Sequence, residues 1–229
     1  MPLRILIFLG LVAVPLLAGL DPEVTAQKEF EQTIDAVVRQ KNYYKAGHLE
    51  LDLVAGGMPY DALVDHLMYG PRVAWHISDH WGWEIIDAQF DRSKVSGYAR
   101  NNIVFEKGLS NLQVLQIGQY FGTGLLASPL YGKVHFFGRQ VLYFDIYLVA
   151  GLGASYAQTI KLSNKDETLS SNYYPMASVG FGLKIFASSA VGLVVDFRDY
   201  IIQAPLYDTT RIHHNLAVLA GLNIYFPGF

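Results

Sequence analysis

The sequence predicts an all-β protein: an antiparallel, up-and-down transmembrane β-barrel of eight strands, with ten strands as an open alternative. Three observations predict this fold class: the composition, a period-two alternation in eight segments, and an alternation of short and long connections. Only 16% of the 229 residues are charged, whereas soluble domains average about 25%. The chain also contains 15 Tyr, 13 Phe and 21 Gly, a mixture typical of strands that face lipid on one side.

The N-terminus has the arrangement of a secretory signal peptide over residues 1–20. Arg4 precedes an apolar run, and small residues follow at Ala18 and Gly19. Pro15 interrupts this run, which is shorter than the roughly 20 residues that a membrane-spanning helix needs. We therefore expect cleavage near Gly19 and export to the outer membrane, rather than an uncleaved anchor.

Residues 21–45 are polar and carry one apolar stripe at helical spacing. The stripe consists of Phe30, Ile34, Val37 and Val38. This pattern predicts a short helical or disordered periplasmic segment, too small to be a domain. The barrel is then expected to occupy residues 46–229.

From His48 onward, apolar and polar residues alternate with period two, as in half-buried strands. The clearest case places Leu142 and Phe144 on one face and Tyr143 and Asp145 on the other. The eight expected strands lie at 48–55, 72–77, 81–86, 130–137, 141–153, 177–186, 191–200 and 215–226. Strands of this length cross a bilayer when they are tilted.

The connections between these segments alternate in length. Short turns are expected at 78–80, 138–140 and 187–190, and long polar loops at 57–67, 91–128, 158–174 and 203–213. Outer-membrane barrels are built with short periplasmic turns and longer extracellular loops, an arrangement that a soluble sandwich has no reason to adopt. The 91–128 segment could add two strands, or form a helix or an extracellular flap.

With the apolar rows outward, the charged side chains of the strands collect inside. The inward set is Glu50, Asp52, Arg72, Glu84, Lys133, Asp145, Lys184, Asp196 and Arg198. Acids and bases are nearly balanced, and an eight-stranded barrel is just wide enough to be filled by side chains. We expect an ion-pair network that closes the barrel; the alternative is an ion path or gate.

Two segments, SPLYGKVHFFGRQVLYFDIYLVAGLG (128–153) and VVDFRDY (194–200), resemble a known family. It is the outer-membrane β-barrel domain family of myxobacteria and their delta-proteobacterial relatives. Its members share Pro-x-Tyr-Gly-Lys, Phe-Asp-x-Tyr and Asp-x-Arg-Asp-Tyr stretches and a final strand like the one from Asn215 to Phe226. The resemblance extends from about Lys41 to the end. It implies a barrel of the OmpA/OmpX size class without an assigned reaction, in a family often associated with larger envelope assemblies.

One pair of residues raises the possibility of catalysis. His76 and Ser78 have the His-x-Ser spacing of lipid A deacylases, with Glu84 in the next strand as an orienting acid. However, Asp79 follows where that enzyme family has Asn, and the pair falls at a predicted periplasmic turn, away from the outer-leaflet substrate. We therefore expect no enzyme and no catalytic residues.

Other site classes find little support. His213 and His214 are adjacent and point to opposite faces of a strand, while His66 and His80 have no evident partner, so neither a metal nor another cofactor is expected. The net charge of −3 and the lack of a basic surface exclude nucleic acid.

Trp75, Trp81 and Trp83 lie near the short-turn end. There they fit an aromatic girdle at a membrane interface, with ordinary core aromatics as the alternative. The expected surroundings are outer-membrane lipid and lipopolysaccharide. The expected role is structural or partner-docking in the bacterial envelope, through residues 21–45 or the long loops. The rival functions are a small passive, porin-like pore and a lipid A-modifying enzyme.

Overall fold

The computed structural model describes residues 43–99, 101–102, 112–136, 140–162, 166–188, 190–207 and 209–227. The expected signal peptide (1–20) and all but the last residues of the 21–45 segment lie outside this part of the chain. The compact unit that contains the described residues begins at Tyr43, three residues before the expected barrel boundary.

Ten strands are present among these residues. They are β1 (Leu49–Gly57), β2 (Val64–Asp65), β3 (Met68–His76), β4 (Trp81–Asp91), β5 (Lys94–Val95), β6 (Leu112–Phe136), β7 (Gln140–Leu162), β8 (Glu167–Phe186), β9 (Val191–Leu206) and β10 (Thr209–Phe226). Each of the eight expected segments overlaps one of the eight long strands, and the segments 48–55, 72–77 and 130–137 each extend one residue beyond theirs. The turn expected at 78–80 is confirmed, and β8 and β9 are joined by a connection as short as the expected 187–190 turn. Residue 189 of that turn and residues 137–139 of the remaining one lie outside the described chain.

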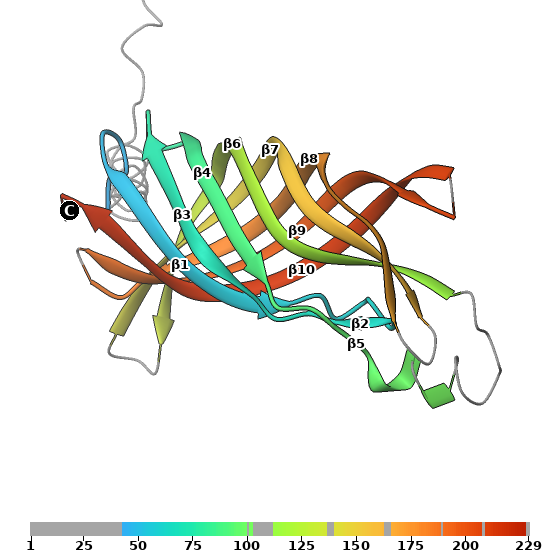
Figure 1. Cartoon of the computed structure of the whole chain (residues 1–229). Coiled ribbons are helices and arrows are strands. Elements are labelled where there is room, and N and C mark those ends of the chain that lie inside the picture. Colours follow the sequence, from blue (N-terminus) through green and yellow to red (C-terminus); the bar gives the residue numbers. More distant parts are fainter. Residues whose placement is uncertain are drawn as a thin grey trace, which may run out of the picture. The chain divides into compact units, whose positions relative to one another are not determined.

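The eight long strands form a closed antiparallel barrel in the order β1-β10-β9-β8-β7-β6-β4-β3 (Figure 1). Because β1 pairs with β10 as well as with β3, the barrel has no open edge along its paired length. The strands β2 and β5 pair separately as a small two-stranded sheet. The predicted eight-stranded up-and-down barrel is confirmed, and the ten-stranded alternative is wrong.

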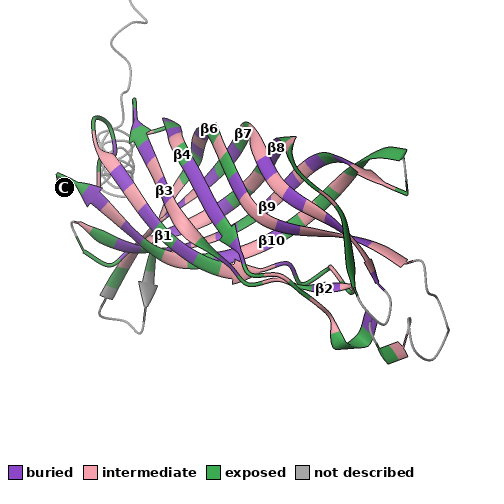
Figure 2. Ribbon diagram, viewed as in Figure 1, coloured by how far each residue is buried: buried purple, intermediate pink, exposed green. Residues whose placement is uncertain are grey.

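Burial alternates along the barrel strands, as Figure 2 shows. On β7, Asp145 and Tyr147 are buried, whereas Leu148, the next residue along the strand, is exposed. This pattern follows from the period of two, which sends successive side chains to opposite faces of a sheet. The polar row of each strand therefore points into the barrel.

The strands differ greatly in length, which the sequence did not predict. β1 and β3 have 9 residues each, whereas β6 has 25 and β7 has 23. The first half of β6 comes from the expected 91–128 loop. The loops expected at 158–174 and 203–213 are also wrong: most of these residues are in paired strands, with Lys161 opposite Glu167 and Leu206 opposite Thr209. Residues 163–165 and 208 lie outside the described chain. Antiparallel partners satisfy the backbone of these hairpins without an apolar row, so the apolar pattern gave no sign of them.

The long strands continue past the barrel as two separate extensions. β8 and β9 are paired only from Met176 and Ile202 toward the short-turn end, so β6–β7–β8 continue as one extension and β9–β10 as the other (Figure 1). The tip of the second returns to the first: the Tyr207 amide donates to Gln113 Oε1 (2.8 Å), and the Gln113 amide donates to the Tyr207 hydroxyl (3.0 Å).

Candidate functional site: the charged barrel interior

Two buried arginines hold the middle of the barrel together. Arg198 on β9 pairs with both carboxylate oxygens of Glu84 (2.7 and 3.0 Å), with Asp87 (2.8 Å) and with Asp196 (3.0 Å). Arg72 on β3 pairs with Asp196 and lies 3.3 Å from Asp87. Charged groups that are taken out of water need partners of opposite sign. This cluster therefore ties β3, β4 and β9 together across the barrel.

A second cluster lies toward the short-turn end, around Glu50 on β1. Lys184 from β8 contacts both Glu50 oxygens, at 2.6 and 2.7 Å. His76 Nε2 lies 2.5 Å from Glu50 Oε2, and Lys184 Nζ also sits 4.5 Å from the centre of the Tyr147 ring. Asp52 is buried next to this cluster, and one of its carboxylate oxygens has no hydrogen-bond partner among the described residues.

The short-turn end of the interior is filled by the chain that leads into β1. Lys45 is fully buried; its ammonium pairs with Asp145 and donates to Ser128 Oγ (2.6 Å). The Tyr43 ring stacks on Phe186 with ring centres 5.0 Å apart. Gly47 has a φ of 80°, a left-handed conformation that suits glycine, and this turn lets the chain pass from Lys45 into β1.

The opposite end of the interior, called the loop end below, is mainly apolar, with polar side chains such as Gln89, Ser155 and Thr159 buried among the apolar ones. Its buried cluster includes Met58, Met68, Ile117, Tyr120, Ala157, Tyr200, Ile202 and Ala204. The Tyr120 and Tyr200 rings lie 4.4 Å apart, and the Tyr200 hydroxyl donates to Asp87 (3.1 Å). Along the barrel axis, the interior thus contains Lys45 at the short-turn end, the two charged clusters in the middle and the mainly apolar cluster at the loop end.

The structure places eight of the nine expected interior charges in buried positions. The other one, Lys133, is only half-buried and lies 5.6 Å from the centre of the Tyr143 ring. Sequence reasoning missed Asp87 because the β3–β4 and β4–β6 registers shift between residues 84 and 87. Such a bulge adds one residue to a strand and so sends both Glu84 and Asp87 inward.

The His76–Ser78 pair has two separate structural roles. His76 points inward to Glu50, whereas Ser78 lies in the β3–β4 turn and accepts hydrogen bonds from the amides of His80 (3.3 Å) and Trp81 (3.0 Å). Glu84 is paired with Arg198 rather than with His76. The geometry gives no nucleophile–base–acid arrangement at this turn.

Two groups of exposed aromatic side chains lie on the outside of the barrel. Trp75, Trp81 and Trp83 are exposed near the short-turn end, with Trp75 opposite Trp83. Tyr69, Phe90 and Phe121 form a second group toward the loop end, with adjacent ring centres 6.1 and 6.0 Å apart. If strand β4 is tilted by roughly 40° from the barrel axis, as strands in barrels are, the distance along that axis from Trp81 to Phe90 is about 23 Å.

His66 was expected to have no partner, and this expectation is wrong. Its Nδ1 lies 2.5 Å from Asp91 at the end of β4, and its Nε2 lies 3.1 Å from Asp61 in the 58–67 loop. Burial opposes a charge on the ring, but the hydrogen bonds and charges of the two carboxylates outweigh it and raise the pKa of His66 from 6.5 to about 9. The contact joins residues 25 positions apart in the sequence, which no local pattern reveals.

We expect this pair to stabilise the 58–67 loop in a pH-dependent way. The folded-state pKa is raised, so the contribution is complete below about pH 6.5 and is lost as the pH rises through about 9. NMR titration of the His66 ring should give a midpoint near 9, and proteolysis of the loop should accelerate above it. The His66→Gln variant should lose this pH dependence, and a wild-type midpoint near 6.5 would contradict the ion pairs.

The remaining histidines and acidic residues of the described chain form no metal site. In that part of the chain, no group of three or more His, Asp or Glu side chains is placed to hold a metal ion. His214 contacts Asp199 at 2.7 Å on the surface. Over the same residues, no helix has the length and apolar character needed to cross a membrane.

The fold and its interior define a closed eight-stranded β-barrel with ion-paired side chains inside. No protein-family model matches the sequence, and no curated protein is significantly similar to it. Structural similarity extends to the N-terminal β-barrel domain of Pseudomonas aeruginosa OprF (13% identity, 79% of this chain and 98% of that chain, TM-score 0.40). It also extends to Neisserial surface protein A (12%, 78% and 95%, 0.43) and to Ail, the attachment invasion locus protein of Yersinia pestis (12%, 79% and 99%, 0.34). At these identities and TM-scores the likenesses assign no function.

Proposed function

We propose that this protein is a non-conducting barrel of the bacterial outer membrane with a structural or partner-docking role in the envelope. The observation that carries the proposal is its inside-out distribution of side chains: ion pairs fill the interior while large apolar side chains cover the outside. The exposed outer row includes Leu53, Ile86, Leu125, Leu130, Leu148, Leu152, Val179, Phe181, Leu193, Phe197 and Leu222. Soluble monomers rarely expose contiguous apolar surface beyond a few hundred Å².

The two exposed aromatic groups support a membrane position. Outer-membrane barrels carry an apolar band about 25 Å tall between two aromatic girdles, close to the roughly 23 Å that separate the levels of Trp81 and Phe90. The short turns then face the periplasm, and the two strand extensions face outward. Strands of about 9–11 residues suffice to cross the bilayer, so the β6–β8 and β9–β10 extensions protrude from it.

A passive pore fits the interior poorly. Lys45, the arginine cluster and the mainly apolar cluster occupy successive levels of the barrel, and an eight-stranded barrel leaves little space beyond its own side chains. A lipid A hydrolase fits poorly as well, because Ser78 caps a turn and His76 is paired with Glu50. The protruding extensions are the better candidates for function, as a docking surface for an envelope partner. The family resemblance around 128–153 and 194–200 remains part of this proposal.

We expect the refolded protein to produce no channel steps in planar bilayers, because the interior is filled. Insertion should be checked on the same preparation by electrophoresis in SDS, where a closed barrel migrates differently before and after boiling. Regular conductance steps from inserted protein would favour the pore instead. Lipid A turnover that disappears in Ser78→Ala would favour the enzyme.

A further inference from the structure

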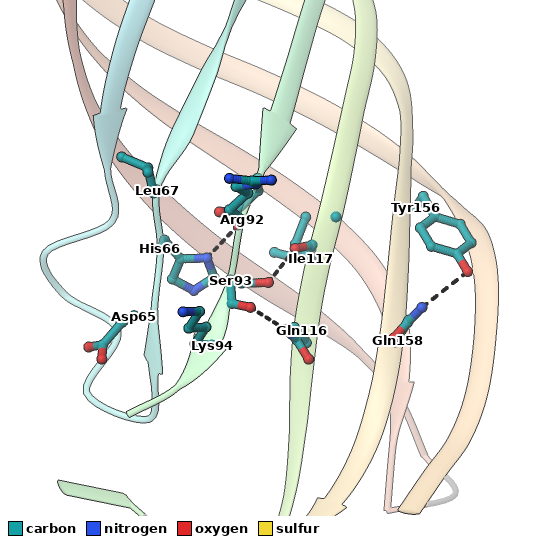
Figure 3. A pocket seen from close by; sticks show the side chains of 12 residues that line it. Asp65, His66, Leu67, Arg92, Ser93, Lys94, Gln116, Ile117, Tyr156 and Gln158 are labelled. Atoms are coloured by element: carbon teal, nitrogen blue, oxygen red, sulfur yellow. Dashed lines mark hydrogen bonds and ion pairs between the residues drawn. The ribbon is translucent and has the colours of Figure 1, made fainter. Parts of the chain in front are cut away.

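A polar groove opens on the outside of the barrel where two neighbouring strands separate. β4 and β6 stay paired as far as Phe90 and Gln119; beyond this point the chain after β4 turns toward β5, while β6 continues beside β7. Ser93 bridges the gap by donating to the Ile117 carbonyl (2.7 Å). The groove has a volume of about 840 Å³ and lies between the β2–β5 sheet and the ends of β6 and β7 (Figure 3).

The groove is lined by two cations, Arg92 and Lys94, that are both exposed. Neither side chain makes a hydrogen bond or an ion pair with another described residue, although the Arg92 amide donates to the Leu67 carbonyl (2.9 Å). The third cation, His66, is neutralised by Asp61 and Asp91. Asp65 faces Lys94 across the small sheet. The three cations and the three acids then balance, so the positive charge of the groove is local to the exposed side chains of Arg92 and Lys94.

The opposite wall offers hydrogen-bonding groups of neutral side chains. Gln116 on β6 donates to the Ser93 carbonyl (2.5 Å), and Gln158 on β7 donates to the Tyr156 hydroxyl (3.2 Å). Figure 3 shows these side chains on the strands facing Arg92 and Lys94. Amide and phenol groups of this kind suit sugar hydroxyls, whereas free cations suit phosphate.

The position of the groove indicates where such a ligand would come from. Arg92 lies two residues after Phe90, just past the end of β4, and Phe90 belongs to the exposed aromatic group with Tyr69 and Phe121. Aromatic girdles mark the headgroup level of a membrane. The two free cations therefore lie at the height of lipid phosphates, if the barrel has the outer-membrane orientation proposed above.

We propose that this groove binds the phosphorylated sugar headgroup of an outer-leaflet lipid. Arg92 and Lys94 contact the phosphate, and Gln116, Tyr156 and Gln158 contact the sugar. The lipid chains run down the apolar outer surface below Phe90 and Phe121. Binding of this kind orients the barrel in the outer leaflet and anchors the loop end.

The test is calorimetric titration of the full-length folded protein in dodecylmaltoside with diphosphoryl lipid A as the probe. We expect the Arg92→Gln/Lys94→Gln double variant to bind about tenfold or more weakly, because two charge-assisted contacts are lost. The matched control is Lys161→Gln/Arg211→Gln, which removes the same charge from residues that do not line the groove. It should bind like the wild type.

Three results would overturn the proposal. They are equal affinity of the double variant and the wild type, equal weakening in the control, and competition by glucosamine 6-phosphate as strong as that by the lipid. The last result would indicate a site for a soluble phosphosugar. Each variant is also compared in SDS electrophoresis before and after boiling. A mobility shift shows a closed barrel whether or not the groove binds lipid, so failure of the lipid-binding proposal can be told apart from failure of the outer-membrane barrel proposal.

Discussion

The substitution Arg198→Met is expected to destabilise the barrel by about 3–5 kcal/mol, because it leaves buried carboxylates without a partner. Arg198 makes four close contacts with Glu84, Asp87 and Asp196. In its absence Arg72 is the one cation among the described residues that still pairs with Asp87 and Asp196. The free energy of unfolding should be measured by urea titration in detergent micelles, followed by tryptophan fluorescence.

The matched control is Arg211→Met, which removes an exposed arginine from the β10 extension. It should change the free energy of unfolding by no more than about 0.5 kcal/mol. Adding Glu84→Gln to Arg198→Met should recover part of the loss, since it removes one of the uncompensated charges. If Arg198→Met is as mild as the control, the interior is hydrated rather than a closed ion-pair network.

The substitution Leu125→Arg is expected to cost more than about 1 kcal/mol, because an arginine on the lipid face of a barrel costs about 2–4 kcal/mol at the middle of the bilayer and about 0–1 kcal/mol near its interfaces. Leu125 is 61% exposed on β6; it lies opposite Trp83 of the first aromatic group and four residues from Phe121 of the second. In water an exposed position of this kind tolerates a charge within about 0.5 kcal/mol. Folding into phosphatidylcholine vesicles across a urea series measures the difference.

Ile212→Arg provides the control, because Ile212 has almost the same exposure, 66%, on the same outer surface. It lies in the β10 extension, beyond Val218, the last residue of β10 that pairs with β1. There the arginine meets water, and the expected change is small. Equal effects of the two substitutions would mean that Leu125 does not face lipid, and the membrane assignment would fail.

The barrel itself could be predicted from sequence because its signal is local. Each spanning strand alternates apolar and polar residues, so the inward position of Asp196 and Arg198 follows from the period of two once a strand is assigned. The extensions carry no such row. Their polar segments, such as 158–174, look like loops until the partner strand is known.

The contacts within the site depend on features that the period of two does not contain. Asp87 points inward only because a bulge precedes it, and Lys45 enters the interior from a segment outside the strands. The His66–Asp91 pair joins a loop to a distant strand end. The Arg92–Lys94 groove exists only because β4 and β6 separate. Each of these features arises from tertiary geometry rather than from a sequence pattern.

The central claim is that the barrel spans a membrane with its apolar row toward lipid. Because the chain contains no cysteine, single Cys substitutions at Leu125, Leu126 and Ile212 can be spin-labelled and reconstituted in vesicles. Collision rates with oxygen and with a water-soluble nickel complex then report the surroundings of each label. We predict that collisions with oxygen are the more frequent at position 125 and that collisions with the nickel complex are the more frequent at position 212. At the buried position 126, both collision rates should be low. Similar nickel accessibility at 125 and 212 would contradict the claim.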